Sequence, residues 1–164
     1  MNIGKEFNNV EKIVIGVGNI LFGDDGFGPK VIEYLKSNYD IKENVLLIDA
    51  GTAVREILFD ILLSDIRLKE ILLIDSVDLR REPGEILELK IPDIPLDNID
   101  RYELHNAPST NLLRELLLKN KADSVRIFAC QVGKLPEEIK IGLSREVEKT
   151  VPILSDSIYK SFLS

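Results

Sequence analysis

The fold is decided by residues 13–28, which read IVIGVGNILFGDDGFG. Residues 13–17 form an apolar run with the length of a buried strand. Two glycines then indicate a tight turn, and Asp24 and Asp25 follow at the mouth of a helix. Pro29 suits the first turn of that helix, because the N–H that proline lacks would have no partner there. The stretch therefore predicts a strand, a glycine turn and a helix. Two carboxylates stand where a nucleotide-binding protein would present bare backbone amides.

Further apolar runs extend this pattern along the chain. Strands are expected at residues 45–48, 71–74 and 124–130, and helices at residues 29–39, 54–65, 109–117 and 144–162. Unbroken apolar strands separated by helices indicate a parallel sheet that is covered on both faces. Residues 86–91 partly alternate between apolar and charged side chains, as an edge strand does. We therefore expect one α/β domain over residues 1–164. It should be a three-layer α/β/α sandwich with a twisted, mainly parallel sheet of about five strands and room for one antiparallel edge strand.

Composition and charge exclude several kinds of partner. The formal net charge of −7 argues against nucleic acid, whose binding needs clustered basic residues. A single cysteine, Cys130, forms no internal disulfide and is typical of a reducing compartment. No apolar run approaches the ~20 residues of a membrane span, and residues 1–12 lack the apolar core of a signal peptide. We expect a cytoplasmic protein that binds neither nucleic acid nor a membrane.

Three side chains are expected to meet at the carboxyl end of the sheet, where doubly wound folds bind their ligands. Asp25 follows the first strand, Asp75 ends the third, and His105 lies in the loop after the edge strand. Two carboxylates and one imidazole suit a divalent transition metal, with coordination positions left for substrate or water. Each residue also has a purely structural interpretation: a helix terminus for Asp25, a turn or cap for Asp75, and a solvated loop for His105.

Other polar residues have simpler interpretations. Asp24 and Asp78 are expected to be solvated or to form turns. Ser144 is expected to cap the last helix, and Pro152 to bend it. Cys130 ends an apolar strand and is expected to be a small buried hydrophobe.

Rival chemistries fit the sequence less well. A dinucleotide fingerprint starting at Gly16 and Gly18 needs glycine where Leu21 stands, and the acidic pair would repel a pyrophosphate. A phosphate-receiving signalling domain also has an acidic pair after its first strand, but residues 92–108 have no counterpart in it. The sequence contains neither Gly-x-Ser-x-Gly nor His-Glu-x-x-His. A Cys130–His105 pair stays open, although nothing in the sequence indicates an activated thiol.

The motif GVGNILFGDDGFG at residues 16–28 resembles the opening motif of the hydrogenase maturation endopeptidases, which process the large subunit of nickel–iron hydrogenases. The similarity continues through DAGT at 49–52, IDSVD at 74–78, PGE at 83–85, LHNAP at 104–108 and IGLS at 141–144. It spans nearly the whole chain and implies the same twisted, mainly parallel sheet between helices. The Gly-Asp-Asp-Gly form is similar to archaeal members, especially those serving deazaflavin-reducing hydrogenases.

The resemblance implies a function and a set of site residues. Asp25, Asp75 and His105 would be both the metal-contacting and the catalytic residues, and bacterial members commonly carry glutamate at the first position. The implied activity is removal of a short C-terminal extension from the nickel-loaded precursor of a hydrogenase large subunit. The precursor would be the partner and would supply the nickel; no nucleotide is expected, and a monomer is favoured. Two alternatives are a metal-dependent maturation chaperone that does not cleave and a nucleotide- or phosphate-binding regulator.

Overall fold

The computed structural model describes residues 7, 9–91 and 107–164. Its strands are β1 (Lys12–Val17), β2 (Val45–Gly51), β3 (Leu68–Val77), β4 (Ile86–Lys90) and β5 (Ala122–Gln131). Its helices are η1 (Gly23–Gly26), α2 (Phe27–Asn38), α3 (Val54–Leu63), α4 (Ala107–Leu118), α5 (Arg145–Glu148), α6 (Thr150–Ile158) and η4 (Tyr159–Leu163). His105, one of the three predicted site residues, lies outside the described residues.

The strands form one five-stranded sheet in the order β2-β1-β3-β5-β4. The pairs β1–β2, β1–β3 and β3–β5 are parallel, and β4 pairs antiparallel with β5 at the edge. The predicted α/β class, the mainly parallel sheet and the antiparallel edge strand are confirmed. The chain passes from β1 to β2 on one side and then returns to β3 on the other. The topological switch point therefore lies between β1 and β3, where ligands of such sheets bind.

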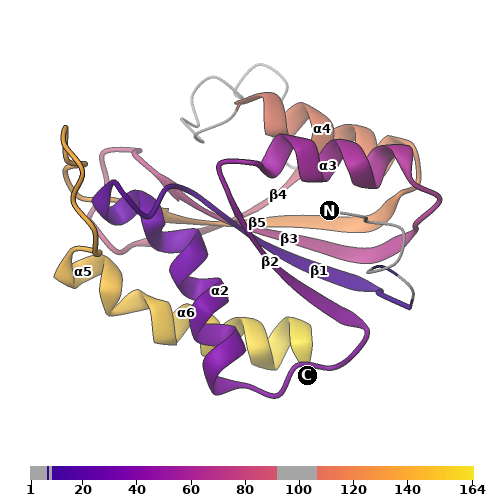
Figure 1. The fold of residues 1–164 in the computed structure, drawn as a ribbon, viewed down its shortest axis with the longest axis horizontal. Coiled ribbons are helices and arrows are strands. Elements are labelled where there is room, and N and C mark those ends of the chain that lie inside the picture. The colour runs from indigo at the N-terminus through magenta and orange to yellow at the C-terminus, as the bar shows by residue number, and fades with distance from the viewer. Residues whose placement is uncertain (1–6, 8, 92–106) are drawn as a thin grey trace.

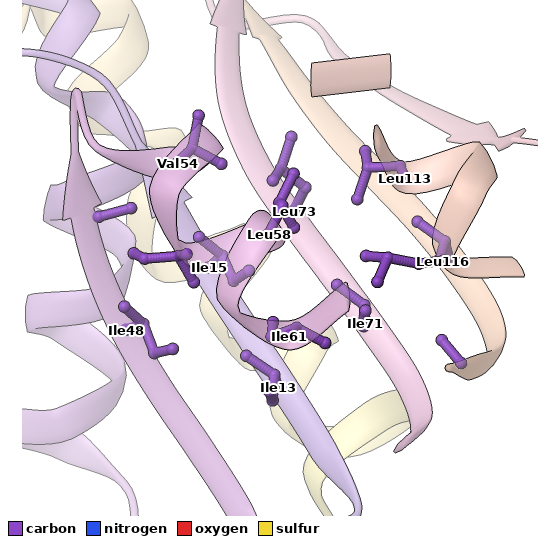
Figure 2. Packing of buried hydrophobic residues seen from close by; sticks show 14 of the residues in the cluster. Ile13, Ile15, Ile48, Val54, Leu58, Ile61, Ile71, Leu73, Leu113 and Leu116 are labelled. Atoms are coloured by element: carbon purple, nitrogen blue, oxygen red, sulfur yellow. The ribbon is translucent and has the colours of Figure 1, made fainter. Parts of the chain in front are cut away.

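Helices cover both faces of the sheet (Figure 1). On one face, α3 and α4 cover the sheet (Figure 2). Leu58 of α3 and Leu113 of α4 belong to the same buried cluster as the strand residues Ile13, Ile15 and Leu73. On the other face, α2 and α6 pack on alternate residues of the same strands, including Val14, Leu72 and Ile74. This division follows from the two-residue period of a strand. Within the described parts of the chain, no helix is long and apolar enough to cross a membrane.

Helix α2 packs directly against the sheet backbone at Gly28, in its first turn. A Cβ atom at Gly28 would lie 2.3 Å from the Val17 carbonyl oxygen and 2.5 Å from that of Ile74. Real Cβ atoms do not approach backbone so closely, so only glycine allows this packing. The close approach brings the start of α2, and the η1 turn before it, against the carboxyl ends of β1 and β3.

The last helix differs from its prediction. It is divided at Lys149 into α5 and α6, and Ser144, at the position before α5, makes no side-chain capping hydrogen bond. Pro152 lies in the first turn of α6, where its missing N–H would otherwise pair with the carbonyl of Glu148, the last residue of α5. Proline therefore accompanies a break between two helices rather than a bend within one. Helix α4 also begins earlier than expected, because Pro108 is tolerated in its first turn.

Candidate active site

At Gly18 the chain after β1 reverses direction, so that Asp25 lies against the backbone of Gly18. This residue has φ of 134°, and a Cβ atom there would lie 1.8 Å from the backbone oxygen of Asp25. Only glycine permits both the conformation and the contact. The glycine turn predicted from the sequence thus brings Asp25 back to the carboxyl end of the strand it follows.

The Asp25 carboxylate is fixed by donors from two separate segments. Its Oδ2 accepts a hydrogen bond from the backbone N–H of Asn19 at 2.9 Å, and its Oδ1 accepts one from the Ser76 hydroxyl at 3.1 Å. The residue is only 8% exposed. Burying a carboxylate is unfavourable unless hydrogen bonds replace water, and these donors provide that compensation.

Asp75 lies within β3, beyond the point where β1 stops pairing with that strand at Gly16 and Ile74. It is 2% exposed, and its Oδ1 accepts a hydrogen bond from the Ser76 backbone N–H at 2.8 Å. Burial raises the pKa of Asp75 to about 8; the Ser76 amide opposes this rise and the nearby Asp25 carboxylate adds to it. The raised pKa favours the protonated form of Asp75 at neutral pH in the folded protein.

Ser76 is a site residue that sequence reasoning missed. It donates to Asp75 through its backbone and to Asp25 through its side chain, so the two predicted acids are brought together at the switch point. The only sequence signal was a small polar residue directly after Asp75, between that acid and the apolar Val77. Such a residue is buried at little cost only when its hydroxyl has an acceptor.

Asp24, which was expected to be solvated or to form a turn, lies in the η1 turn but is not solvated. It is 4% exposed and accepts three hydrogen bonds. The Gly133 N–H donates to Oδ2 at 2.9 Å, the Ser144 N–H to Oδ1 at 2.6 Å, and the Ser144 hydroxyl to Oδ2 at 2.9 Å. Ser144 thus uses its side chain to hold Asp24 rather than to cap a helix. The first carboxylate of the pair secures the turn that carries the second.

Two other aspartates at this end of the sheet form local turns. Asp49, which is exposed, accepts from the Gly51 N–H at 3.0 Å. Asp78, also exposed, accepts from the Arg80 N–H and the Gln131 amide, each at 3.1 Å, and these bonds lower its pKa. The prediction that Asp78 forms a turn is confirmed.

Cys130 is fully buried, as predicted, within the cluster formed with α2 and α6. Burial raises the pKa of its thiol to about 11, so the thiolate is scarce at neutral pH. Since the thiolate is the nucleophile, this environment disfavours a catalytic Cys130–His105 pair.

The described residues hold two thirds of the predicted metal set. Among them, no group of three His, Cys, Asp or Glu side chains gathers closely enough to bind a metal ion. The third member, His105, precedes α4 by two residues in the sequence. Helix α4 ends at Leu118, shortly before β5 begins at Ala122, and its twelve residues span ~18 Å back along the sheet. The chain therefore enters α4 toward the carboxyl end of the sheet, where Asp25 and Asp75 lie.

Two cavities lie beside the η1 turn, and Gly23 lines both of them. The larger, about 690 Å³, is bounded by Gly23, Asp24 and residues 134–140 and 142–144. The smaller, about 310 Å³, lies between the start of α2 and residues 141–143, with Ile20 at its edge. Of the described residues, neither Asp25 nor Asp75 lines them, so these cavities adjoin the acid pair without containing it.

Comparisons with known proteins agree with this arrangement. A family model described as hydrogenase maturation protease matches residues 29–161. A Methanocaldococcus jannaschii protein, whose name assigns it provisionally to the hydrogenase maturation proteases, is 39% identical over 144 residues, covering 85% of this chain and 88% of that protein. The delta subunit of coenzyme F420 hydrogenase from Methanothermobacter thermautotrophicus is 34% identical over 152 residues, covering 88% and 89%.

A solved structure carries the same fold. The nickel–iron hydrogenase maturation protease of Thermococcus kodakarensis superposes with a TM-score of 0.72 at 18% identity, covering 98% of this chain and 97% of that one. The family match extends over most of the chain and includes the strand and turn that carry Asp75. The family that residues 16–28 resemble is the one that the family model and the relatives identify, although the model itself begins at residue 29. The chain belongs to the hydrogenase maturation proteases and is an endopeptidase.

Proposed function

We propose that this endopeptidase removes a short C-terminal extension from the nickel-loaded precursor of a nickel–iron hydrogenase large subunit. The observation that carries the proposal is the pair of buried acids, Asp25 and Asp75, joined through Ser76 at the switch point of the sheet. A protease of this family needs a site that recognises its precursor and activates water. This pair is the candidate that stands where the fold places ligands.

The nickel of the precursor is proposed as the feature that the site recognises. Asp25, Asp75 and His105 would engage it through two carboxyl groups and an imidazole, a mixed oxygen and nitrogen set suited to divalent transition metals. Because the ion belongs to the substrate, the enzyme needs no resident metal. A bound cation would also favour ionisation of Asp75, whose carboxyl is otherwise neutral at pH 7. Precursor binding and loss of that proton are therefore coupled.

Hydrolysis requires a polarised scissile carbonyl and a deprotonated water. The substrate's nickel would supply Lewis acidity if the carbonyl lies against it. We assign water activation to Asp25 or a neighbouring carboxylate, because a general base must lie within hydrogen-bond reach of the water. The cavities beside η1 give the chain flanking the cleaved bond a place to lie.

Substitution of the three site residues tests the proposal. Asp25→Asn, Asp75→Asn and His105→Ala should each reduce release of the C-terminal peptide by ~100-fold or more while the protein stays folded, because each removes a group that acts on the reacting centre. Peptide release is followed by mass spectrometry of nickel-loaded precursor, and folding by circular dichroism.

Asp123→Asn is the matched control. Asp123 is exposed and pairs with Arg67 at the other end of β5, so its loss should leave cleavage unchanged. Normal cleavage by all three site variants would refute the assignment. A wild-type protein that binds the precursor and releases no peptide would instead identify a non-cleaving chaperone.

A further inference from the structure

We propose that Ser76 is a positioning residue that holds the Asp25 and Asp75 carboxyl groups in a fixed mutual arrangement. This inference rests on the proposed function, because it assigns Ser76 a part in the same site. Ser76 follows Asp75 in β3 and is fully buried. It contacts both acids and is itself neither acid, base nor nucleophile in the reaction.

The two contacts leave Ser76 from different groups. Its backbone N–H donates to Asp75 Oδ1 at 2.8 Å, and its hydroxyl donates to Asp25 Oδ1 at 3.1 Å. Successive side chains of a strand point to opposite faces. Ile74, two residues earlier, packs in the cluster with α2, so the Ser76 side chain leaves β3 on the α2 face, away from the Asp75 side chain. Ser76 therefore contacts both acids, although Asp25 belongs to η1 and Asp75 to β3.

The hydroxyl contact also determines how Asp25 is turned. The other oxygen, Oδ2, accepts from the Asn19 N–H at 2.9 Å. Asn19 lies in the loop after β1 and Ser76 lies on β3, so the carboxylate is held between two segments that flank the switch point. Rotation of the carboxylate about its Cβ–Cγ bond would strain both hydrogen bonds. The Ser76 hydroxyl is thus the contact that sets the orientation of Asp25 relative to β3.

Such outer contacts affect metal recognition and rate. Hydrogen bonds to a ligating carboxylate fix the direction of its remaining lone pairs, and losing one costs ~10–100-fold in metal affinity or activity. Ser76→Ala removes the hydroxyl contact to Asp25 but keeps the backbone N–H that holds Asp75. The substitution therefore isolates the positioning of one acid against the other.

The chain offers a matched control for this substitution. Ser155 is also fully buried, and its hydroxyl has no hydrogen-bond partner among the described residues. Ser155→Ala removes the same atom from an equally buried site on α6 without loss of a hydrogen bond. Ser76→Thr is the rescue variant, since it restores a hydroxyl. If the added methyl group prevents folding, Ser76→Cys, with a weaker donor of similar size, takes its place.

Two measurements decide the proposal: kinetics on nickel-loaded precursor, and carbon-13 NMR of the aspartate carboxyl groups without metal. We expect Ser76→Ala to lower kcat by ~10–100-fold with KM little changed, and to shift the Asp25 carboxyl signal. Ser155→Ala should do neither, and Ser76→Thr should recover kcat toward the wild-type value.

A folded Ser76→Ala protein with wild-type kcat, or with an unshifted Asp25 signal, would overturn the proposal. An equal loss of kcat in Ser155→Ala would overturn it as well, because the effect would then follow from altered packing. If the wild-type protein cleaves no precursor, the proposed function fails. The NMR comparison then still decides whether Ser76 orients Asp25.

Discussion

The Asp75 carboxyl group resists ionisation because it is buried. In an unfolded chain the group ionises at pH ~3.9, whereas burial raises its pKa to about 8 in the folded protein. Between these pH values the folded state binds a proton that the unfolded state has released. Stability therefore falls as pH rises through this range, by at most about 1.4 kcal/mol for each pH unit.

Asp75→Asn should remove this pH dependence, because an amide has no charge to desolvate. We expect the variant to have a higher urea midpoint than the wild type near pH 8.5 and a similar midpoint near pH ~3, below the unfolded pKa, where Asp75 is protonated in both the folded and the unfolded state. The same variant should be inactive. Its stability gain would be the cost that the site imposes on the fold.

Asp78→Asn provides the contrast, since hydrogen bonds lower the pKa of that exposed carboxyl. Ionised Asp78 stabilises the fold above pH ~4, so this variant should show no gain at high pH. A wild-type protein whose stability relative to Asp75→Asn stays level or rises from pH ~3 to ~8.5 would contradict the buried, neutral state of Asp75.

Residues of the candidate site were predictable from the sequence to different degrees. Asp25 and Asp75 follow from apolar runs that end in acids, together with the rule that ligands bind beyond the carboxyl ends of strands. The roles of Asp24 and Ser76 depend on partners far along the chain: the donors to Asp24 are 109 and 120 residues away. A local pattern identifies a residue suited to a turn, but contains no information on distant donors.

At the scale of elements, one carboxylate fastens residues 133–144 to the η1 turn. Asp24 receives the hydrogen bonds of Gly133 and Ser144 at the two ends of this segment. Between them, Lys140 bridges Phe22, with its N–H donating to the Leu21 carbonyl at 2.8 Å. The segment that bounds the larger cavity is therefore attached to the turn that carries Asp25.

Asp24→Ala should loosen this segment. Two backbone N–H groups would lose their acceptor, which should lower the free energy of unfolding by about 2–4 kcal/mol and speed hydrogen exchange at Gly133 and Ser144. Ser144→Ala, which removes only the hydroxyl donor, should cost about 1 kcal/mol and leave exchange at Gly133 slow. Unchanged exchange of both amides in Asp24→Ala would show that other contacts hold the segment.

Element types were easier to predict than element ends. The apolar run at residues 71–74 identified β3, yet the strand extends over Leu68–Val77. Beyond the apolar run the strand includes Lys69, which is exposed, and Asp75, which is buried and polar. An apolar run therefore identifies the centre of the strand and misses its polar residues, one of which belongs to the candidate site.

At the scale of the whole molecule, the order of the strands explains why the acids meet. The chain moves outward from β1 to β2 and returns to β3, so the loops after β1 and β3 leave the sheet in different directions. The space between them receives Asp25 from one side and Asp75 from the other. The Thermococcus kodakarensis protease has the same fold, although only 18% of the aligned residues are identical.

The most direct test of the proposed function is the nickel dependence of cleavage. Large-subunit precursor is prepared with and without nickel and incubated with the wild-type protein, and the products are weighed by mass spectrometry. We predict release of one C-terminal peptide from the nickel-loaded precursor and none from the nickel-free precursor, because Asp25, Asp75 and His105 would recognise the ion. Equal cleavage of both precursors, or cleavage of neither, would contradict this account.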